Sequence, residues 1–195
     1  MRVLGRTAAV RVGIAIMALI ALVGCASGPD FQTTGPETDT LVFGYIDSGE
    51  LRRASLNTFE VRELQPNRDR EDFEVEISNE GLYSYIGDPS GTYKTLHVEL
   101  TQRAGLGLSR ARITLNFAIN ERNVFDVELD RQPGIHYVGA ATFEQTVDGG
   151  LFLADEYELT DHRDVGERDA LLLLQEEVAG TVWESVVAQR LAELN

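Results

Sequence analysis

Apolar and polar side chains alternate along most of the chain after Leu41, with the period of two that is typical of β-strands. The clearest run is Ala111–Asn120 (ARITLNFAIN), and Phe73–Asn79 and Val124–Asp130 repeat its pattern. Leu41–Asp47 (LVFGYID) is apolar in both phases, which is typical of a central strand buried on two faces. The side chains expected to face a core are Ala111, Ile113, Leu115, Phe117 and Ile119, then Phe73, Val75 and Ile77, and finally Phe125, Val127 and Leu129.

Turn-forming Gly, Pro, Asn and Asp residues separate these runs from one another, for example at Gly87–Gly91 and at Asp148–Gly150. The predicted strands are Leu41–Asp47, Thr58–Arg62, Phe73–Asn79, Leu82–Ile86, Thr92–Thr101, Ala111–Asn120, Val124–Asp130, Ile135–Thr146 and Leu151–Leu159. Short, half-buried strands at regular spacing indicate an antiparallel sandwich or barrel. We therefore expect a mainly β fold, an antiparallel β-sandwich of about 7–9 strands.

The last 30 residues change to the period of a helix. Glu167–Ala179 and Thr181–Leu194 each carry an apolar stripe at helical spacing. Gly180 between them predicts a break, and Thr181 followed three residues later by Glu184 has the pattern of a capping box. The sequence thus predicts two short helices that cap one end or face of the sandwich, with a partner-binding helix as the alternative.

The first 24 residues have the pattern of an export signal. Arg2, Arg6 and Arg11 precede the apolar run Val12–Val23, and no acidic residue occurs before Cys25. A run of 12 apolar or small residues is too short for a transmembrane helix, which needs about 20 residues.

Leu22-Val23-Gly24-Cys25 closes this run and resembles the lipobox of bacterial lipoproteins. The resemblance implies a diacylglyceryl group on the Cys25 sulfur and cleavage before Cys25. Membrane attachment would then come from acyl chains, of which two or more give stable anchoring. Ala26 follows the cysteine where Asp would hold an enterobacterial lipoprotein in the inner membrane. The resemblance therefore implies the outer membrane of a bacterial envelope, with the domain facing the periplasm.

Four regions follow from these patterns: the signal (1–24), a lipidated, flexible tether rich in Gly, Pro and Thr (25–40), the sandwich (41–165) and the helices (166–195). Without the signal, the basic residues fall from 17 to 14 against 32 acidic residues, a net charge of −18. Such a surface repels nucleic acid and anionic lipid head groups, so no nucleic-acid partner is expected. Cys25 is the sole cysteine, so no disulfide can form within the chain.

Two segments resemble transthyretin-like and carboxypeptidase-regulatory-like β-sandwiches. Pro89-Ser90-Gly91-Thr92-Tyr93 is similar to their Pro-x-Gly-x-Tyr entry into a strand. Pro133–Gly139 (PGIHYVG) is similar to a Pro-Gly-x-x-Tyr-x-Gly strand of bacterial lipoproteins that carry such a domain. The resemblance spans residues 41–160 and implies a fold and an envelope location, without a reaction.

The sequence offers little for a metal or cofactor site, and we predict neither. His97, His136 and His162 lie far apart, and strand phase predicts that His97 and His136 face solvent. The acidic run Asp155–Asp164 lacks the residue order of a calcium loop. Gly105–Leu108 lacks the Gly-Lys-Ser/Thr ending of a phosphate loop.

No catalytic residue is predicted either. No Gly-x-Ser-x-Gly elbow occurs, and Ser90 in GDPSG stands one place late for it. Three hypotheses remain open. The first is a non-enzymatic envelope module that binds a protein partner or supports an assembly. The second is an envelope hydrolase that acts on a polymer or peptide, and the third is a small-ligand or metal carrier.

Overall fold

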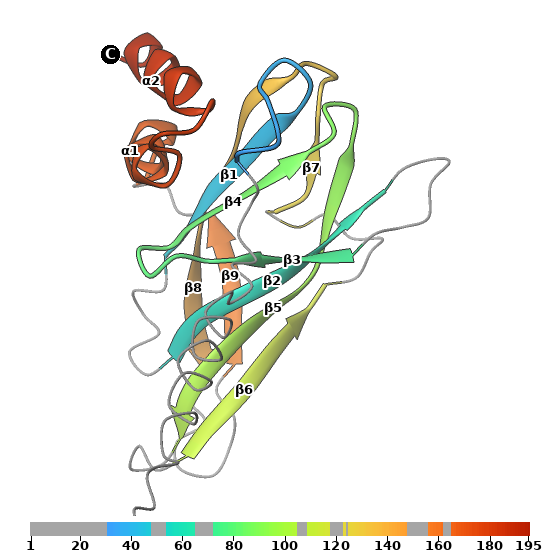
Figure 1. Ribbon diagram of the computed structural model, residues 1–195. Coiled ribbons are helices and arrows are strands. Elements are labelled where there is room, and N and C mark those ends of the chain that lie inside the picture. Colours follow the sequence, from blue (N-terminus) through green and yellow to red (C-terminus); the bar gives the residue numbers. More distant parts are fainter. Residues whose placement is uncertain are drawn as a thin grey trace, which may run out of the picture.

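Two β-sheets pack face to face, and two helices cover one of them (Figure 1). The computed structural model describes residues 31–47, 54–64, 72–104, 109–117, 123, 125–147, 156–161 and 165–195. The first sheet has the order β4-β1-β8-β9, formed by Leu82–Gly87, Thr40–Asp47, Gly134–Val147 and Glu156–Asp161. The second has the order β3-β2-β5-β6, formed by Asp72–Glu76, Ala54–Glu63, Thr92–Ala104 and Ser109–Asn116, and β7 (Val127–Glu128) also pairs with β5. The predicted mainly β sandwich with C-terminal helices is confirmed.

β1 is the central strand that its two apolar phases predict. Val42 and Ile46 enter the core between the sheets, while Leu41 and Phe43 pack under the helices. All four side chains are 0% exposed. The sandwich therefore has two apolar cores, one between the sheets and one between the first sheet and the helical layer.

One strand pair differs from the antiparallel expectation, because β1 and β8 run parallel. The other strand pairs among the described residues are antiparallel. Alternation records which face a residue occupies and carries no information on strand direction. A tight turn would fix that direction, but β1 and β8 are separated by six other strands in the chain.

β7 is much shorter than the strand predicted over Val124–Asp130. The side chain of Asn123 accepts a hydrogen bond from the Phe125 N–H at 2.9 Å, and Asp126 Oδ2 accepts one from the Asn123 N–H at 3.1 Å. These side-chain bonds close a turn and occupy donors that a strand ladder would use. The predicted core positions Phe125, Val127 and Leu129 are nevertheless buried, at 4%, 3% and 6% exposure.

Other strand ends differ by a few residues from the predicted ones. β3 ends at Glu76 rather than Asn79, and β6 ends at Asn116. The expected core residue Ile119 and most of the predicted strand Leu151–Leu159 lie outside the described residues.

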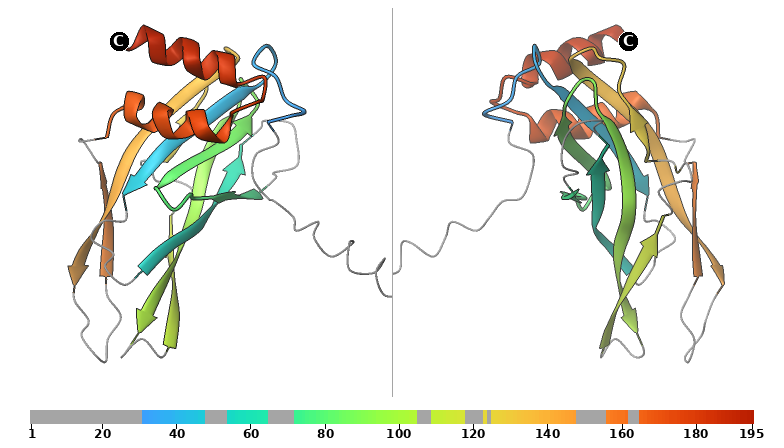
Figure 2. Two further views of the ribbon diagram at one scale, coloured as in Figure 1. Left: turned by 60° about the vertical axis from the view of Figure 1, so that its left-hand side comes forward. Right: turned by 90° about the vertical axis from the view of Figure 1, so that its right-hand side faces the viewer.

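The helices α1 (Glu167–Glu177) and α2 (Glu184–Glu193) lie across the outer face of the first sheet (Figure 2). The chain breaks between them at Gly180, which has a φ of +77°. The predicted capping box is shifted by one residue: Thr181 Oγ1 accepts the Trp183 N–H at 3.2 Å, and Glu184 accepts the Gly180 N–H at 2.8 Å. This turn places Trp183, at 0% exposure, in the core under the helices.

The segment before β1 also packs on this layer. Phe31 contacts the core under the helices, and the Trp183 indole N–H donates to Thr34 Oγ1 at 3.4 Å. A turn follows, in which the Asp39 N–H donates to the Gly35 carbonyl at 2.9 Å. Residues 31–39 thus lie against the domain, in contrast to the flexible tether predicted through residue 40.

Candidate functional site

An acidic recess of about 510 Å³ lies between β7 and the first half of β8. Its lining combines apolar side chains with three carboxylates and one imidazole. The lining residues are Asp126, Val127, Glu128, Leu129, Asp130, His136 and Val138. A volume in this range is typical of ligand sites.

Asp126 is the most deeply buried acid of the recess, with a side chain 6% exposed. Its Oδ2 pairs with the Lys94 ammonium of β5 and accepts the Asn123 N–H. Its Oδ1 is buried and has no hydrogen-bond partner among the described residues. An unpaired buried acceptor costs about 1–3 kcal/mol, so the fold holds Asp126 at this position at some cost in stability.

Sequence reasoning singled out neither Asp126 nor Lys94, because alternation assigns residue 126 to a solvent face. The ladder pairs Thr92 with Glu128 and Tyr93 with Val127, so Lys94 lies across from Asp126. The signal that could have found the pair is this cross-strand register, which depends on the fold.

Strand phase predicted that His136 faces solvent, but its side chain lines the recess. Its neighbours Ile135 and Tyr137 pack under the helices, so His136 lies on the opposite face of β8 from them, as alternation predicts. This opposite face of β8 is itself partly covered, by the wall of the recess. Burial lowers the pKa of His136, and this effect outweighs the attraction of Asp130 and Glu167, which raises it. The imidazole is therefore neutral at neutral pH, and the recess keeps its acidic character.

The walls of the recess are held by the turn between β4 and β5. The Leu129 N–H donates to the Gly91 carbonyl at 3.1 Å, and the Arg131 N–H donates to the Pro89 carbonyl at 2.9 Å. Arg131 takes a φ of +69° to make this connection. On the β8 side, the Gly134 N–H donates to the Asp39 carbonyl at 3.0 Å.

The Pro89–Tyr93 motif has a structural role in that turn. The Tyr93 hydroxyl accepts the Asp88 N–H at 2.6 Å and donates to Glu63 Oε1 at 2.9 Å. The Ser90 hydroxyl and backbone N–H both donate to Asp88 Oδ1, at 2.7 and 2.8 Å, and these bonds help to close the turn. Side chains from β2 and β5 thus hold this turn in place. The turn itself holds residues 129–131 at the wall of the recess.

The Pro133–Gly139 motif shapes β8. Gly134 and Gly139 take φ values of +130° and +131°, and Gly139 lies where the register with β1 shifts. The Tyr137 ring packs on Phe43 at a centroid distance of 5.3 Å, and its hydroxyl donates to the Val165 carbonyl at 3.2 Å. Gly139 thus lies at an irregularity in the ladder between β1 and β8, of the kind that a β-bulge produces.

The remaining predicted residues do not assemble into a site. His97 lies on β5 in the other sheet and pairs with Glu60 of β2 at 3.2 Å. Cys25, His162 and Gly105–Leu108 lie outside the described residues, as do both ends of the Asp155–Asp164 run. Within the described ranges, no three His, Cys, Asp or Glu side chains are grouped to hold a metal.

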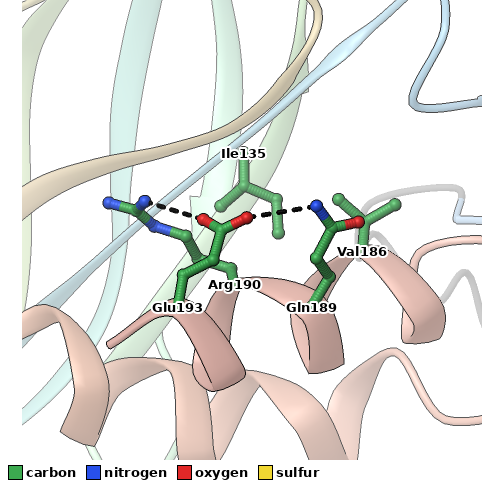
Figure 3. Close-up of a pocket in the computed structure, with 5 residues that line it drawn as sticks. All are labelled: Ile135, Val186, Gln189, Arg190 and Glu193. Carbon is green, nitrogen blue, oxygen red and sulfur yellow. Dashed lines mark hydrogen bonds and ion pairs between the residues drawn. The ribbon is translucent and has the colours of Figure 1, made fainter. Parts of the chain in front are cut away.

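A second, smaller recess of about 290 Å³ lies between α2 and Ile135 of β8 (Figure 3). The Glu193 carboxylate stands between two partners there, Arg190 at 3.2 Å and Gln189 at 3.1 Å. Arg190 also reaches Glu167 of α1 at 2.7 and 3.0 Å. The polar side chains of this recess form hydrogen bonds and ion pairs with one another and with Glu167, so we interpret it as a contact that holds α1 and α2 together.

In the part of the chain that the structure describes, no helix is both long and apolar enough to cross a membrane. Comparisons with known proteins found no family model, no curated protein and no solved structure that matches this chain.

Proposed function

We propose that this chain is an exported, lipid-anchored protein of the bacterial cell envelope whose sandwich binds a partner without catalysing a reaction. The anchor would be acyl groups on Cys25, and the site would be the acidic recess between β7 and β8. The lipobox pattern at Leu22–Cys25 supports the anchor. The outer membrane, with the domain on the periplasmic side, is the proposed location.

The observation that carries the binding role is the recess itself, which is lined by the three carboxylates of Asp126, Glu128 and Asp130. Lys94 offsets one of these carboxylates, and the pKa of His136 is lowered by burial, so negative charge remains in excess. A partner with a basic segment would supply the opposite charge and charge-assisted hydrogen-bond donors.

The carrier and hydrolase hypotheses have less support from the structure. The volume of the recess favours a small cationic ligand as a second candidate, and native mass spectrometry of the domain tests it directly. The hydroxyls of Ser84, Ser90 and Ser185 donate to carboxylate or carbonyl oxygens. The Ser78 hydroxyl accepts the Leu82 N–H. None of these four hydroxyls is bonded to an imidazole, so they give the hydrolase hypothesis no supporting observation.

The anchor is tested by intact mass and membrane fractionation in a Gram-negative host. We expect the wild type to carry acyl mass and to sediment with outer membrane, and Cys25→Ser to lose both. Ser27→Ala keeps the cysteine and serves as the matched control. A wild-type protein that is soluble and unacylated would overturn the anchor.

The site is tested by crosslinking in intact cells with Asp126→Asn and the pair Glu128→Gln, Asp130→Asn. We expect these variants to lose partners that the wild type captures. Glu144→Gln removes an exposed acid at the far end of β8 and should capture the same partners as the wild type. Equal capture by the recess variants would show that binding lies elsewhere.

A further inference from the structure

We infer that the sandwich stands on the membrane with one defined end toward the lipid. This end carries residues 31–39, the connection between α1 and α2, and the mouth of the recess. The inference rests on the proposed acylation of Cys25 and concerns how the attached domain is oriented.

A short length of chain separates the lipid from the packed domain. Phe31 already contacts the core under the helices, and Thr34 is bonded to Trp183. Only six peptide units join Cys25 to Phe31, and a fully extended chain of that length spans about 20 Å. Phe31 therefore stays within roughly that distance of the lipid.

The sandwich is long compared with the reach of this linker. β5 runs from Thr92, next to the recess, to Ala104 at the opposite end. At about 3.3 Å per residue this strand is roughly 40 Å long, twice the reach of the linker. Figure 2 shows that the paired ends of β5–β6 and β8–β9 point away from the helices and from the segment before β1.

The recess lies at the end of the domain that carries residues 31–39, which we call the near end. Gly134 is bonded to Asp39, and Thr40 Oγ1 donates to the Gln132 carbonyl at 3.3 Å. The recess thus adjoins the segment that leads to the lipid. A partner in the recess would meet the domain close to the membrane surface.

The near end carries several acidic side chains, which disfavour close contact with anionic lipid. Glu37, Asp39, Glu128 and Asp130 lie there, and like charges repel anionic head groups. Among the exposed large apolar side chains of the described residues, Val182, at 54% exposure beside Trp183, lies at this end. The near end therefore faces the lipid surface without inserting a large apolar area into it.

Energy transfer from a single dye to acceptor-labelled lipid tests the orientation. Val182→Cys and Arg112→Cys place a reactive thiol at two exposed positions, because the Cys25 sulfur would be acylated. Arg112 lies across from Thr101, about 30 Å along β5 from the recess end at 3.3 Å per residue. The acylated full chain is studied in vesicles of zwitterionic lipid.

We expect several-fold more transfer from a dye at residue 182 than from one at residue 112. Equal transfer, or more from residue 112, in a protein whose acyl mass is confirmed would overturn the orientation and leave the anchor intact. Absence of acyl mass would instead overturn the anchor, and the orientation with it. As a control, each cysteine variant is also made with Cys25→Ser, and its energy transfer gives the background expected for a domain that is not attached to the lipid.

Discussion

The ring of Tyr93 fills the space beside Gly91 in which any side chain would begin. A Cβ on Gly91 would lie 2.5 Å from the Tyr93 hydroxyl oxygen and 2.6 Å from two ring carbons. Tyr93 is 1% exposed and bonded at its hydroxyl, so the ring has no free space to move into. The glycine of the Pro-x-Gly-x-Tyr motif is therefore required by packing.

Gly91→Ala should lower the free energy of unfolding by about 1–3 kcal/mol, the usual cost of overpacking a filled site. Urea denaturation followed by circular dichroism measures this loss. Gly35→Ala is the control, because its Cβ would meet its nearest neighbour at 3.4 Å, an ordinary contact. A Gly91→Ala protein as stable as the Gly35→Ala protein would refute the packing argument.

Trp183→Ala should be more damaging, because this side chain is 0% exposed between the helices and the first sheet. Deleting a buried tryptophan costs about 3–5 kcal/mol. Thermal unfolding measures the effect, and Trp183→Phe, which keeps a ring, should lose less. Val182→Ala alters an exposed neighbour and should stay within about 0.5 kcal/mol of wild type. Similar losses at 182 and 183 would contradict docking through Trp183.

Stability should fall as the pH drops below about 6.5, in part because of His136. Burial lowers the pKa of His136 in the folded protein, with Asp130 and Glu167 opposing. Between the unfolded and the lowered pKa, the unfolded chain binds a proton that the folded protein does not. The His136 contribution is thus present above pH 6.5 and lost as the pH falls through this window.

His136→Gln removes this proton uptake. Urea denaturation at pH 7.5 and at pH 5.5 should therefore show a smaller change in stability for the variant than for the wild type. Identical changes in both proteins would mean that His136 titrates alike in the folded and unfolded chains.

Arg190→Lys should lower the free energy of unfolding only slightly, by weakening the contact between α2 and Glu167 of α1. Arg190 holds both carboxylate oxygens of Glu167, a geometry that lysine cannot reproduce. The Arg190 side chain is 41% exposed, so solvent screening limits the expected loss to less than about 1 kcal/mol. The loss should shrink at about 1 M salt. Ser185→Ala on the same helix is the control, and a loss that salt does not change would exclude an ionic origin.

The buried positions could be predicted from the sequence wherever they depend only on the spacing of apolar residues along one strand or helix. Val42 and Phe43 point to opposite faces of β1, and both are buried as the doubly apolar run predicts. The chain turns at Gly180, three residues after the end of α1, and Trp183 continues the apolar stripe into the helical core. In each case a local rule gives the answer without knowledge of the partner strand or helix.

The recess could not be predicted in the same way, because it depends on which strands become neighbours. Asp126 and Lys94 meet only through the β5–β7 register. His136 faces the recess because helices distant in sequence occupy the other side of β8. The parallel pairing of β1 with β8 has no local signal, since no short turn joins the two strands.

The position of β1 has a mechanical consequence. Under the proposed attachment, any pull between the membrane and a bound partner enters the domain through residues 31–39 and then β1. This strand is hydrogen-bonded along both edges, to β4 and to β8, and buried on both faces. A force along it must shear two ladders together instead of opening one bond at a time from an edge. The domain is thus tethered through a strand that is paired along both edges, and forced unfolding of the anchored protein should be slow.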